Sequence, residues 1–284
     1  MATKSLPQAP PPPTYIFREH KSSVNSVHLF DNDQYLASSD GDGWVIIWSM
    51  RTKRPLLKWK AHKDNCLKVT TVKNNQLISQ GRDNMIHIWQ LPSLQDASLN
   101  EVPELISSIV YNGLGFCKFS YDDSEESMLL CFPSIEEIAL FDIYDLTYQR
   151  YLARNIGQID SGSVRLGSCM AVELFRTSDT LFVLAGYESG TVALWEINKT
   201  SKLVWHQQVH TEPGIVAVKI RPDNKIFASG GYDGRIRIFS VKSMKPLAIL
   251  SYHRNTTYGL DFSRNGNWLI GSSQDNRISL WSIF

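Results

Sequence analysis

Short segments with alternating apolar and polar residues recur along the whole chain, each interrupted by small or turn-forming residues. Residues 36–49, "LASSDGDGWVIIWS", and residues 227–240, "FASGGYDGRIRIFS", share one layout: an apolar segment, a turn rich in Gly and Asp, and an alternating segment. A period of two is typical of strands that bury one face. The pattern therefore predicts β-hairpins joined by tight turns.

This hairpin pattern is an internal repeat. Further copies occupy 77–90, 184–196 and 269–282, and a degenerate copy ends at 134–142. Each copy closes on an aromatic residue, and these are Trp48, Trp89, Phe141, Trp195, Phe239 and Trp281. Additional strands are predicted before or after several copies, at 24–30, 215–220, 256–262, 55–60 and 246–250. Four strands in about 40–45 residues, repeated around a centre, predict an all-β propeller with six visible repeats.

The two ends of the chain carry predictions of their own. Residues 1–13 are rich in proline and predict a disordered, extended tail before a propeller that spans 14–284. Such a tail suits either a ligand for a proline-binding domain or a simple spacer before the first strand, and the spacer is favoured. Residues 14–20, "TYIFREH", predict a strand without a blade, and the chain ends directly after the third strand of the last repeat. We therefore expect this N-terminal strand to complete the last blade and close the ring, which would hide the sheet edges.

Composition narrows the range of partners. A formal net charge of +1 provides no overall field that would attract nucleic acid or an anionic membrane. The N-terminus lacks a secretory signal pattern, and no segment reaches the roughly 18 apolar residues of a membrane helix. The four cysteines have no metal-ligand spacing, so we expect reduced, mostly buried thiols in an intracellular protein.

Polar residues recur at fixed distances from the aromatic ends of the repeats. The turn aspartates are Asp42, Asp83, Asp233 and Asp275. Histidines begin several repeats at His20, His62, His210 and His253, and serines precede the aspartates at Ser38, Ser79 and Ser229. This combination resembles the WD40 family. The resemblance implies a buried hydrogen-bond relay that runs in each blade from His through Ser and Asp to Trp.

Two relay sets are complete in the sequence, His20/Ser38/Asp42/Trp48 and His62/Ser79/Asp83/Trp89. The third set ends in Phe239, which has no indole N–H, and the last set, with Trp281, has Gly271 where a serine is expected. A nucleophilic triad is needed once, whereas these residues recur in successive blades. We therefore assign them a structural role and predict a protein that is not an enzyme, with no catalytic, cofactor-binding or metal-binding residues.

Residues beside the turn aspartates are expected to surround the mouth of the central channel. The candidate partner-binding residues are Trp44, Arg82, Glu188, Tyr232, Arg235, Gln274 and Arg277. Arg, Tyr and Trp are frequent anchors of protein interfaces. The alternative is that Arg82 and Arg235 pair with nearby carboxylates and that Tyr232 covers its turn. The irregular segment 91–140 is a second candidate surface, because long insertions in repeat proteins often carry partners.

Several longer stretches, among them "LISQGRDNMIHIW", "VLAGYESGTVALW" and "QDNRISLWSIF", resemble one branch of the WD40 family. This is the branch of the fungal ASTRA-associated proteins and the animal G-protein β-subunit-like relative. The resemblance implies seven blades, and the extra blade would lie between Trp195 and Pro213, where this chain is short.

The same resemblance implies a non-enzymatic scaffold whose partners are protein subunits. These belong to the ASTRA assembly and the TTT co-chaperone, which supports the maturation of phosphatidylinositol-3-kinase-related kinases. It also implies a link to chromatin remodelling and a nuclear location, with the cytoplasm as a second compartment. Neither direct nucleic-acid contact, a membrane nor a small-molecule substrate is expected. The alternative function is a substrate receptor of a cullin-type ubiquitin ligase, although residues 48–51, "WSMR", lack the aspartate typical of that class.

Overall fold

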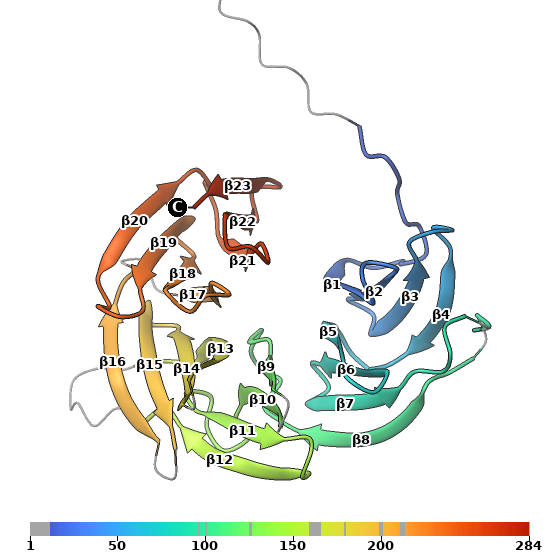
Figure 1. The fold of residues 1–284 in the computed structure, drawn as a ribbon, viewed down its shortest axis with the longest axis horizontal. Helices are drawn as coiled ribbons and strands as arrows, with labels where there is room; N and C mark the ends of the chain where they lie inside the picture. Colours follow the sequence, from blue (N-terminus) through green and yellow to red (C-terminus); the bar gives the residue numbers. More distant parts are fainter. Residues whose placement is uncertain are drawn as a thin grey trace, which may run out of the picture.

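The fold consists of six antiparallel sheets arranged around a common centre (Figure 1). The computed structural model describes residues 12–95, 97–99, 101–124, 127–158, 166–178, 180–198, 201–210 and 214–283. Most of the predicted proline-rich tail therefore lies outside the described residues. The described ranges contain no helix with the length and apolar character that crossing a bilayer requires.

We number the sheets as blades 1 to 6 in chain order. Blade 1 contains β1 Val24–Phe30, β2 Tyr35–Asp40, β3 Trp44–Ser49 and β4 Pro55–Lys60. Blade 2 contains β5 Cys66–Val72, β6 Gln76–Gly81, β7 Met85–Gln90 and β8 Glu104–Val110. Blade 3 contains β9 Ser120–Asp123, β10 Met128–Pro133, β11 Phe141–Asp145 and β12 Arg150–Ile156. Blade 4 contains β13 Cys169–Thr177, β14 Thr180–Tyr187, β15 Thr191–Ile197 and β16 Lys202–Gln208. Blade 5 contains β17 Ile215–Ile220, β18 Ile226–Gly231, β19 Arg235–Ser240 and β20 Pro246–Ser251. Blade 6 contains β21 Thr257–Phe262, β22 Trp268–Ser273 and β23 Ile278–Ser282.

In each blade the strands pair in chain order, and the first strand lies nearest the centre of the ring (Figure 1). The hairpins predicted from the repeats are confirmed, as are the additional strands at 24–30, 55–60 and 215–220. Residues 104–110 form β8, the outer strand of blade 2. All four cysteines are free and buried, as expected.

Apolar side chains from neighbouring blades pack against each other between the sheets. Between blades 1 and 2, for example, Trp59 lies edge-on to Trp89 with ring centroids 5.8 Å apart. The described residues form five such clusters, one for each successive pair of blades. None of the five joins blade 6 to blade 1. The blades are therefore held as an open series rather than a closed circle.

The expected closure by the N-terminal strand is wrong. Blade 6 has three strands, and residues 14–20 form no strand. They run along blade 1 instead: Phe17 packs edge-on against Trp48 at 5.0 Å, and the Tyr15 hydroxyl donates to the Lys53 carbonyl oxygen. Since blade 6 stands across a gap from this segment (Figure 1), β23 keeps an unpaired edge.

The gap leaves apolar side chains without a neighbouring blade. On β23, Ile278 and Leu280 are 69% and 63% exposed, and on β1, Val27 is 63% exposed. The opposite face of blade 6 is covered, because Leu269 is fully buried against blade 5. In the described part of the chain, an ion pair between Arg264 and Asp33, 3.9 Å apart and exposed to solvent, spans the two sides.

The family resemblance implied seven blades, and the structure has six. The short segment after Trp195 contains β16, and blades 4 and 5 pack directly through residues such as Leu194 and Val218. No space for a further blade remains at that point. The opening in the ring lies instead between the first and last blades, far along the chain from the short segment.

Candidate partner-binding face

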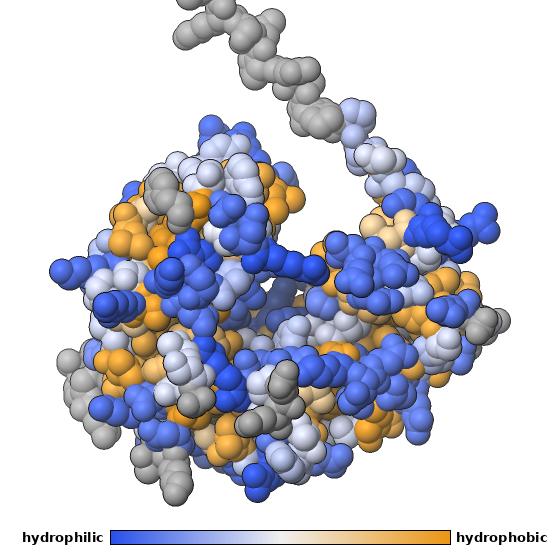
Figure 2. All heavy atoms as spheres, in the orientation of Figure 1, coloured by the Kyte–Doolittle hydropathy of each residue, from blue (hydrophilic) through white to orange (hydrophobic). Residues whose placement is uncertain are grey.

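The turns between the second and third strands of the blades share one face with the loops that join successive blades. Histidines in those loops meet side chains of the following turn, as His62 meets Asp83. We call this surface the channel-mouth face. Hydrophilic side chains surround the central hollow of the ring in Figure 2. The polar relays lie beneath this face and determine how rigidly its turns are held.

Blade 2 contains the relay in the form that the family resemblance implies. His62 Nε2 is 2.8 Å from the Ser79 hydroxyl, and the Trp89 indole N–H donates to the same hydroxyl at 2.9 Å. His62 Nδ1 is 2.9 Å from Asp83, which also accepts the backbone N–H of Lys63. Burial alone would raise the pKa of the Asp83 carboxyl, but its bonds to His62 and Lys63 hold that pKa below its usual value. The carboxylate therefore ties the loop to the turn.

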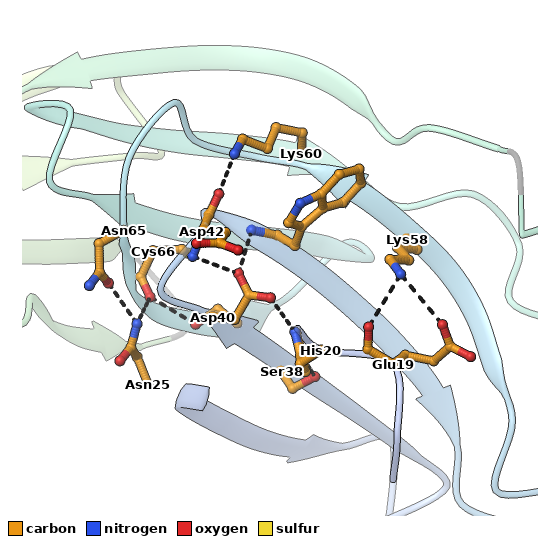
Figure 3. A network of polar contacts seen from close by, with 12 residues as sticks. Glu19, His20, Asn25, Ser38, Asp40, Asp42, Lys58, Lys60, Asn65 and Cys66 are labelled. Atoms are coloured by element: carbon orange, nitrogen blue, oxygen red, sulfur yellow. Dashed lines mark hydrogen bonds and ion pairs between the residues drawn. The ribbon is translucent and has the colours of Figure 1, made fainter. Parts of the chain in front are cut away.

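Blade 1 uses a different aspartate from the one predicted. His20 Nδ1 lies 2.7 Å from Asp40, whereas the Asp42 carboxylate is exposed and takes no part (Figure 3). Asp40 also accepts the backbone N–H groups of Asp42 and Trp44, each at 3.0 Å. Ser38 completes the relay with His20 at 2.7 Å and with the Trp48 indole at 2.8 Å.

The glycine at the end of the second strand explains this exchange. In blade 2 a Cβ placed on Gly81 would stand 2.2 Å from His62 Nδ1 and 2.6 Å from Asp83, so the histidine–carboxylate pair occupies the volume over that glycine. In blade 1 the equivalent position is Asp40, as both residues pair with the start of the first strand. A carboxylate already at that position reaches the histidine directly, and the turn aspartate is not needed.

Blade 5 lacks the indole and gains a guanidinium. His210 bridges Ser229 at 3.0 Å and Asp233 at 2.9 Å. Phe239 stacks on Phe227 with ring centroids 4.9 Å apart, and Arg237 donates to Asp233 at 2.7 Å. Burial lowers the pKa of His210, and the positive charge of Arg237 lowers it further. The Asp233 carboxylate acts in the opposite direction but does not outweigh them.

In blade 6 the serine of the relay is Ser279 on β23, which pairs with the position on β22 where the serine was expected. His253 Nε2 is 2.8 Å from Ser279, and the Trp281 indole donates to Ser279 at 2.9 Å. Ser279 pairs directly with Gly271 across the two strands. The hydroxyl therefore comes from β23 instead of β22, and the relay that looked incomplete is whole.

The repeated relays do not provide a catalytic site. Each histidine has both ring nitrogens engaged with a serine and a carboxylate of its own blade, and each serine hydroxyl is buried. His62, Asp83 and His87 have ligand atoms within 4.8 Å of one another, a spacing that suits a metal ion. However, the His62 and His87 rings are stacked at 4.7 Å and 16°. Ring nitrogens direct their lone pairs in the plane of the ring, so stacked rings do not point at a shared ion.

The candidate partner-binding residues fall into two groups on the ring. On blades 1 and 2, Lys58 Nζ lies 5.6 Å from the Trp44 ring centroid, and Arg82 lies 4.7 Å above the Phe116 ring. Arg82 also donates to the Leu114 carbonyl oxygen at 3.4 Å, so it braces the 114–116 loop instead of pairing with a carboxylate.

On blades 4 to 6 the candidates remain more accessible. Glu188 accepts both the backbone N–H and the hydroxyl of Ser168, which lowers its pKa. The Tyr232 ring lies against Gly214 and covers its turn, yet 44% of the side chain is exposed. Arg235, Gln274 and Arg277 are exposed, and Arg277 lies 5.7 Å from the Tyr252 ring centroid. Tyr232, Arg235, Gln274 and Arg277 thus offer an exposed aromatic and polar arc.

The second candidate surface, 91–140, is largely part of the propeller. Within it, Asp122 pairs with Arg176 at 2.5 Å and Asp123 with Lys73 at 2.9 Å. Residues 104–110 are the outer strand of blade 2. The segment is therefore a weaker candidate than the channel-mouth face.

Comparisons with known proteins agree with this architecture. A family model described as "ASTRA-associated protein 1" matches residues 13–265. The ASTRA-associated protein 1 of Schizosaccharomyces pombe is 29% identical over 366 residues, which cover 96% of this chain and 99% of the relative. The guanine nucleotide-binding protein subunit beta-like protein 1 of Mus musculus is 29% identical over 331 residues, covering 97% of each. In fold alone, the chain is similar to the computationally designed Ika8 protein, with a TM-score of 0.66 and 17% identity over 94% of this chain and 73% of that one.

These alignments are longer than the chain itself. With 331 aligned positions against 284 residues, the mouse protein has at least 47 residues that find no counterpart here. One WD40 blade takes about 40–45 residues. The difference is thus large enough for one blade, in agreement with a ring that does not close.

Proposed function

Because this chain belongs to the ASTRA-associated protein 1 family, we propose that it is a non-catalytic WD40 adaptor of the ASTRA complex. The observation that carries the proposal is the family match over residues 13–265, which spans nearly the whole propeller. The names of the relatives refer to association with ASTRA, and a propeller is well suited to holding several loops in fixed positions.

The mechanism that we propose is rigid display. The relays tie each histidine loop to its turn, so side chains such as Tyr232 and Arg277 are held before a partner arrives. Binding then orders few additional side chains, and the entropy lost on association is small. Arg82, stacked on Phe116, is a further preorganised anchor.

At a finer level we propose that the partners are subunits of the TTT co-chaperone, that the clients are phosphatidylinositol-3-kinase-related kinases, and that the link extends to chromatin remodelling. The expected location is the nucleus, with a cytoplasmic pool. The family resemblance supports these statements, and no geometric feature of the ring carries them independently.

Affinity purification of the tagged chain from its native cells, followed by mass spectrometry, tests this proposal. ASTRA and TTT subunits are expected among the bound proteins. Recovery of a cullin adaptor in their place would reject the proposal and favour the ubiquitin-ligase alternative. Recovery of neither group would leave the family relationship without the proposed role.

A further inference from the structure

The first strand of each blade lines the central channel, and the strand register places its side chains in tiers. In five blades a bulge near the start of this strand interrupts its pairing with the second strand. The first residue that pairs again after the bulge occupies the same position in each of these blades. In blade 2, for example, Lys68 pairs with Gln80, and in blade 5 Ala217 pairs with Gly230. We call the tier at this position the upper tier, because it lies next to the turns of the channel-mouth face. Its members are Ser26, Lys68, Lys118, Ala171, Ala217 and Gly259, with Lys118 placed two residues before Ser120 of blade 3.

The tier below it carries charges that compensate one another. Lys219 Nζ lies 2.9 Å from Glu173 and 3.7 Å from Asp261. The second oxygen of Glu173 accepts the Ser120 hydroxyl at 3.1 Å. These carboxylates are therefore engaged with partners in their own tier.

The two lysines of the upper tier have no carboxylate partner among the described residues. Lys68 Nζ donates to the Phe119 carbonyl oxygen at 2.8 Å, and Lys118 Nζ donates to the Asn25 carbonyl oxygen at 3.1 Å. An ammonium group has three donors, so each retains two. Burial, followed by the charge of Lys219, lowers the pKa of Lys68 to about 8, and burial lowers the pKa of Lys118. Both cations are partly removed from water and form no ion pair among the described residues, although the Glu173 and Asp261 carboxylates act on Lys68 from the tier below.

Small residues face these lysines across the channel. Ala171, Ala217 and Gly259 line a cavity of about 680 Å³ together with Lys68 and Lys118. Tyr232 and Tyr258 also line it, as do Glu173 and Lys219, which are paired with each other in the tier below. Pockets of about 300–1,000 Å³ are the usual size for small ligands. The upper tier thus combines two adjacent positive charges with open volume opposite them.

We propose that the upper tier binds a phosphate group through Lys68 and Lys118. A phosphate monoester carries a charge near −2 and three strong acceptor oxygens, which match two ammonium groups with free donors. The group belongs either to a small phosphorylated molecule or to a phosphoserine side chain that enters from the channel-mouth face. This site is independent of the ASTRA proposal, because its ligand chemistry follows from the channel alone.

Titration calorimetry on the purified full chain tests the site. The probes are inorganic phosphate, a short phosphoserine peptide and its unphosphorylated twin. If inorganic phosphate and the phosphoserine peptide bind with similar affinity, the ligand is a small phosphorylated molecule. If the phosphoserine peptide binds more tightly than inorganic phosphate, the ligand is a phosphorylated protein segment. Lys68→Gln and Lys118→Gln are each expected to weaken binding about ten-fold or more. Lys202→Gln, on the exposed outer strand of blade 4, is the matched control and should leave the affinity unchanged.

Two further measurements separate binding from a structural role of the lysines. Ala217→Glu keeps both lysines but places a carboxylate in the opposite wall, so it should abolish binding while the variant stays folded.

At pH 8 the parent should take up a fraction of a proton on binding, because the anion raises the pKa of Lys68. Calorimetry in two buffers of different ionisation enthalpy measures this proton uptake. His28, Lys118, Lys219, Glu173 and Asp261 are the other charged or titratable groups that influence Lys68. Failure of every phosphate probe to bind, or equal affinity for the parent and both lysine variants, would overturn the proposal.

Discussion

At the scale of single residues, the relays show how the same polar cluster is assembled from different positions. The histidine is constant, whereas the carboxylate moves from Asp83 in blade 2 to Asp40 in blade 1. The hydroxyl moves from Ser79 to Ser279. Spacing alone predicts the usual positions but not these exchanges, because they depend on which side chain points at the histidine across the strands. Ser279 opposite Gly271 is the one signal in the sequence that could have revealed its exchange.

Asp40 and Asp42 provide a direct comparison. Asp40→Asn should lower the free energy of unfolding by about 1–3 kcal/mol, since it removes a buried carboxylate that accepts from two backbone N–H groups and meets His20. Asp42→Asn should change it by less than about 0.5 kcal/mol, because that side chain is exposed. Chemical denaturation measures both. Equal losses would mean that Asp42 belongs to the relay.

The serine exchange in blade 6 predicts a rescue. Ser279→Ala should cost about 1–3 kcal/mol, because His253 Nε2 and the Trp281 indole lose their common partner. Adding Gly271→Ser should recover part of that loss by restoring a hydroxyl in its usual place. The new Cβ would stand 2.7 Å from the flexible end of Ile236, which has to shift. Thermal denaturation of the single and double variants checks this; a double variant less stable than Ser279→Ala would refute it.

Two half-buried histidines predict how stability depends on pH. Burial, followed by Lys68 or His62 respectively, lowers the pKa values of His28 and His87 to about 4, against about 6.5 in an unfolded chain. Between pH 6.5 and 4 the unfolded state binds more protons, so stability should fall as the pH drops through this window and then level off. Both rings are partly exposed, so we expect a loss on the order of 1 kcal/mol for each. Denaturation midpoints of the parent and of His28→Gln/His87→Gln measure it, with His206→Gln on the exposed β16 as the control. An unchanged slope in the double variant would contradict the assignment.

At the scale of the elements, hydrophobic alternation predicted the hairpins and their neighbouring strands well, since each strand has one face against the next blade. Alternation could not predict that residues 14–20 form no strand and pack against blade 1. Tyr15 and Phe17 have the alternation of a strand, but a strand also needs an edge to pair with. With the edge of β23 across the gap, Phe17 packs on Trp48 instead.

The two faces of blade 6 should respond differently to mutation. Leu280→Ser should change the free energy of unfolding by less than about 0.5 kcal/mol, because 63% of this side chain is exposed at the gap. Leu269→Ala, on the buried face, should cost about 2–5 kcal/mol. Denaturant titration of both variants gives the comparison. A cost above about 2 kcal/mol for Leu280→Ser would show that another element covers the gap.

At the scale of the whole molecule, the structure is a series of six blades that share five apolar interfaces and leave one gap. The repeats predicted the number of blades, but not the position of the gap. Packing between successive blades is local and satisfied at each of the five junctions, and the ring stays open between blades 6 and 1. The channel-mouth face is continuous across the five intact junctions, and this is where an adaptor has fixed side chains to offer.

The measurement that tests the adaptor account most directly is quantitative purification of the tagged parent and two variants from native cells. Arg82→Glu/Tyr232→Ala alters the channel-mouth face, and Lys202→Glu/Val204→Ala alters the exposed outer strand β16 as a matched control. With folding verified for each protein, ASTRA subunits should be recovered with the parent and the control, and reduced at least about ten-fold with the face variant. Equal recovery with all three proteins would contradict binding through this face, and absence of the subunits from the parent would contradict the adaptor function itself.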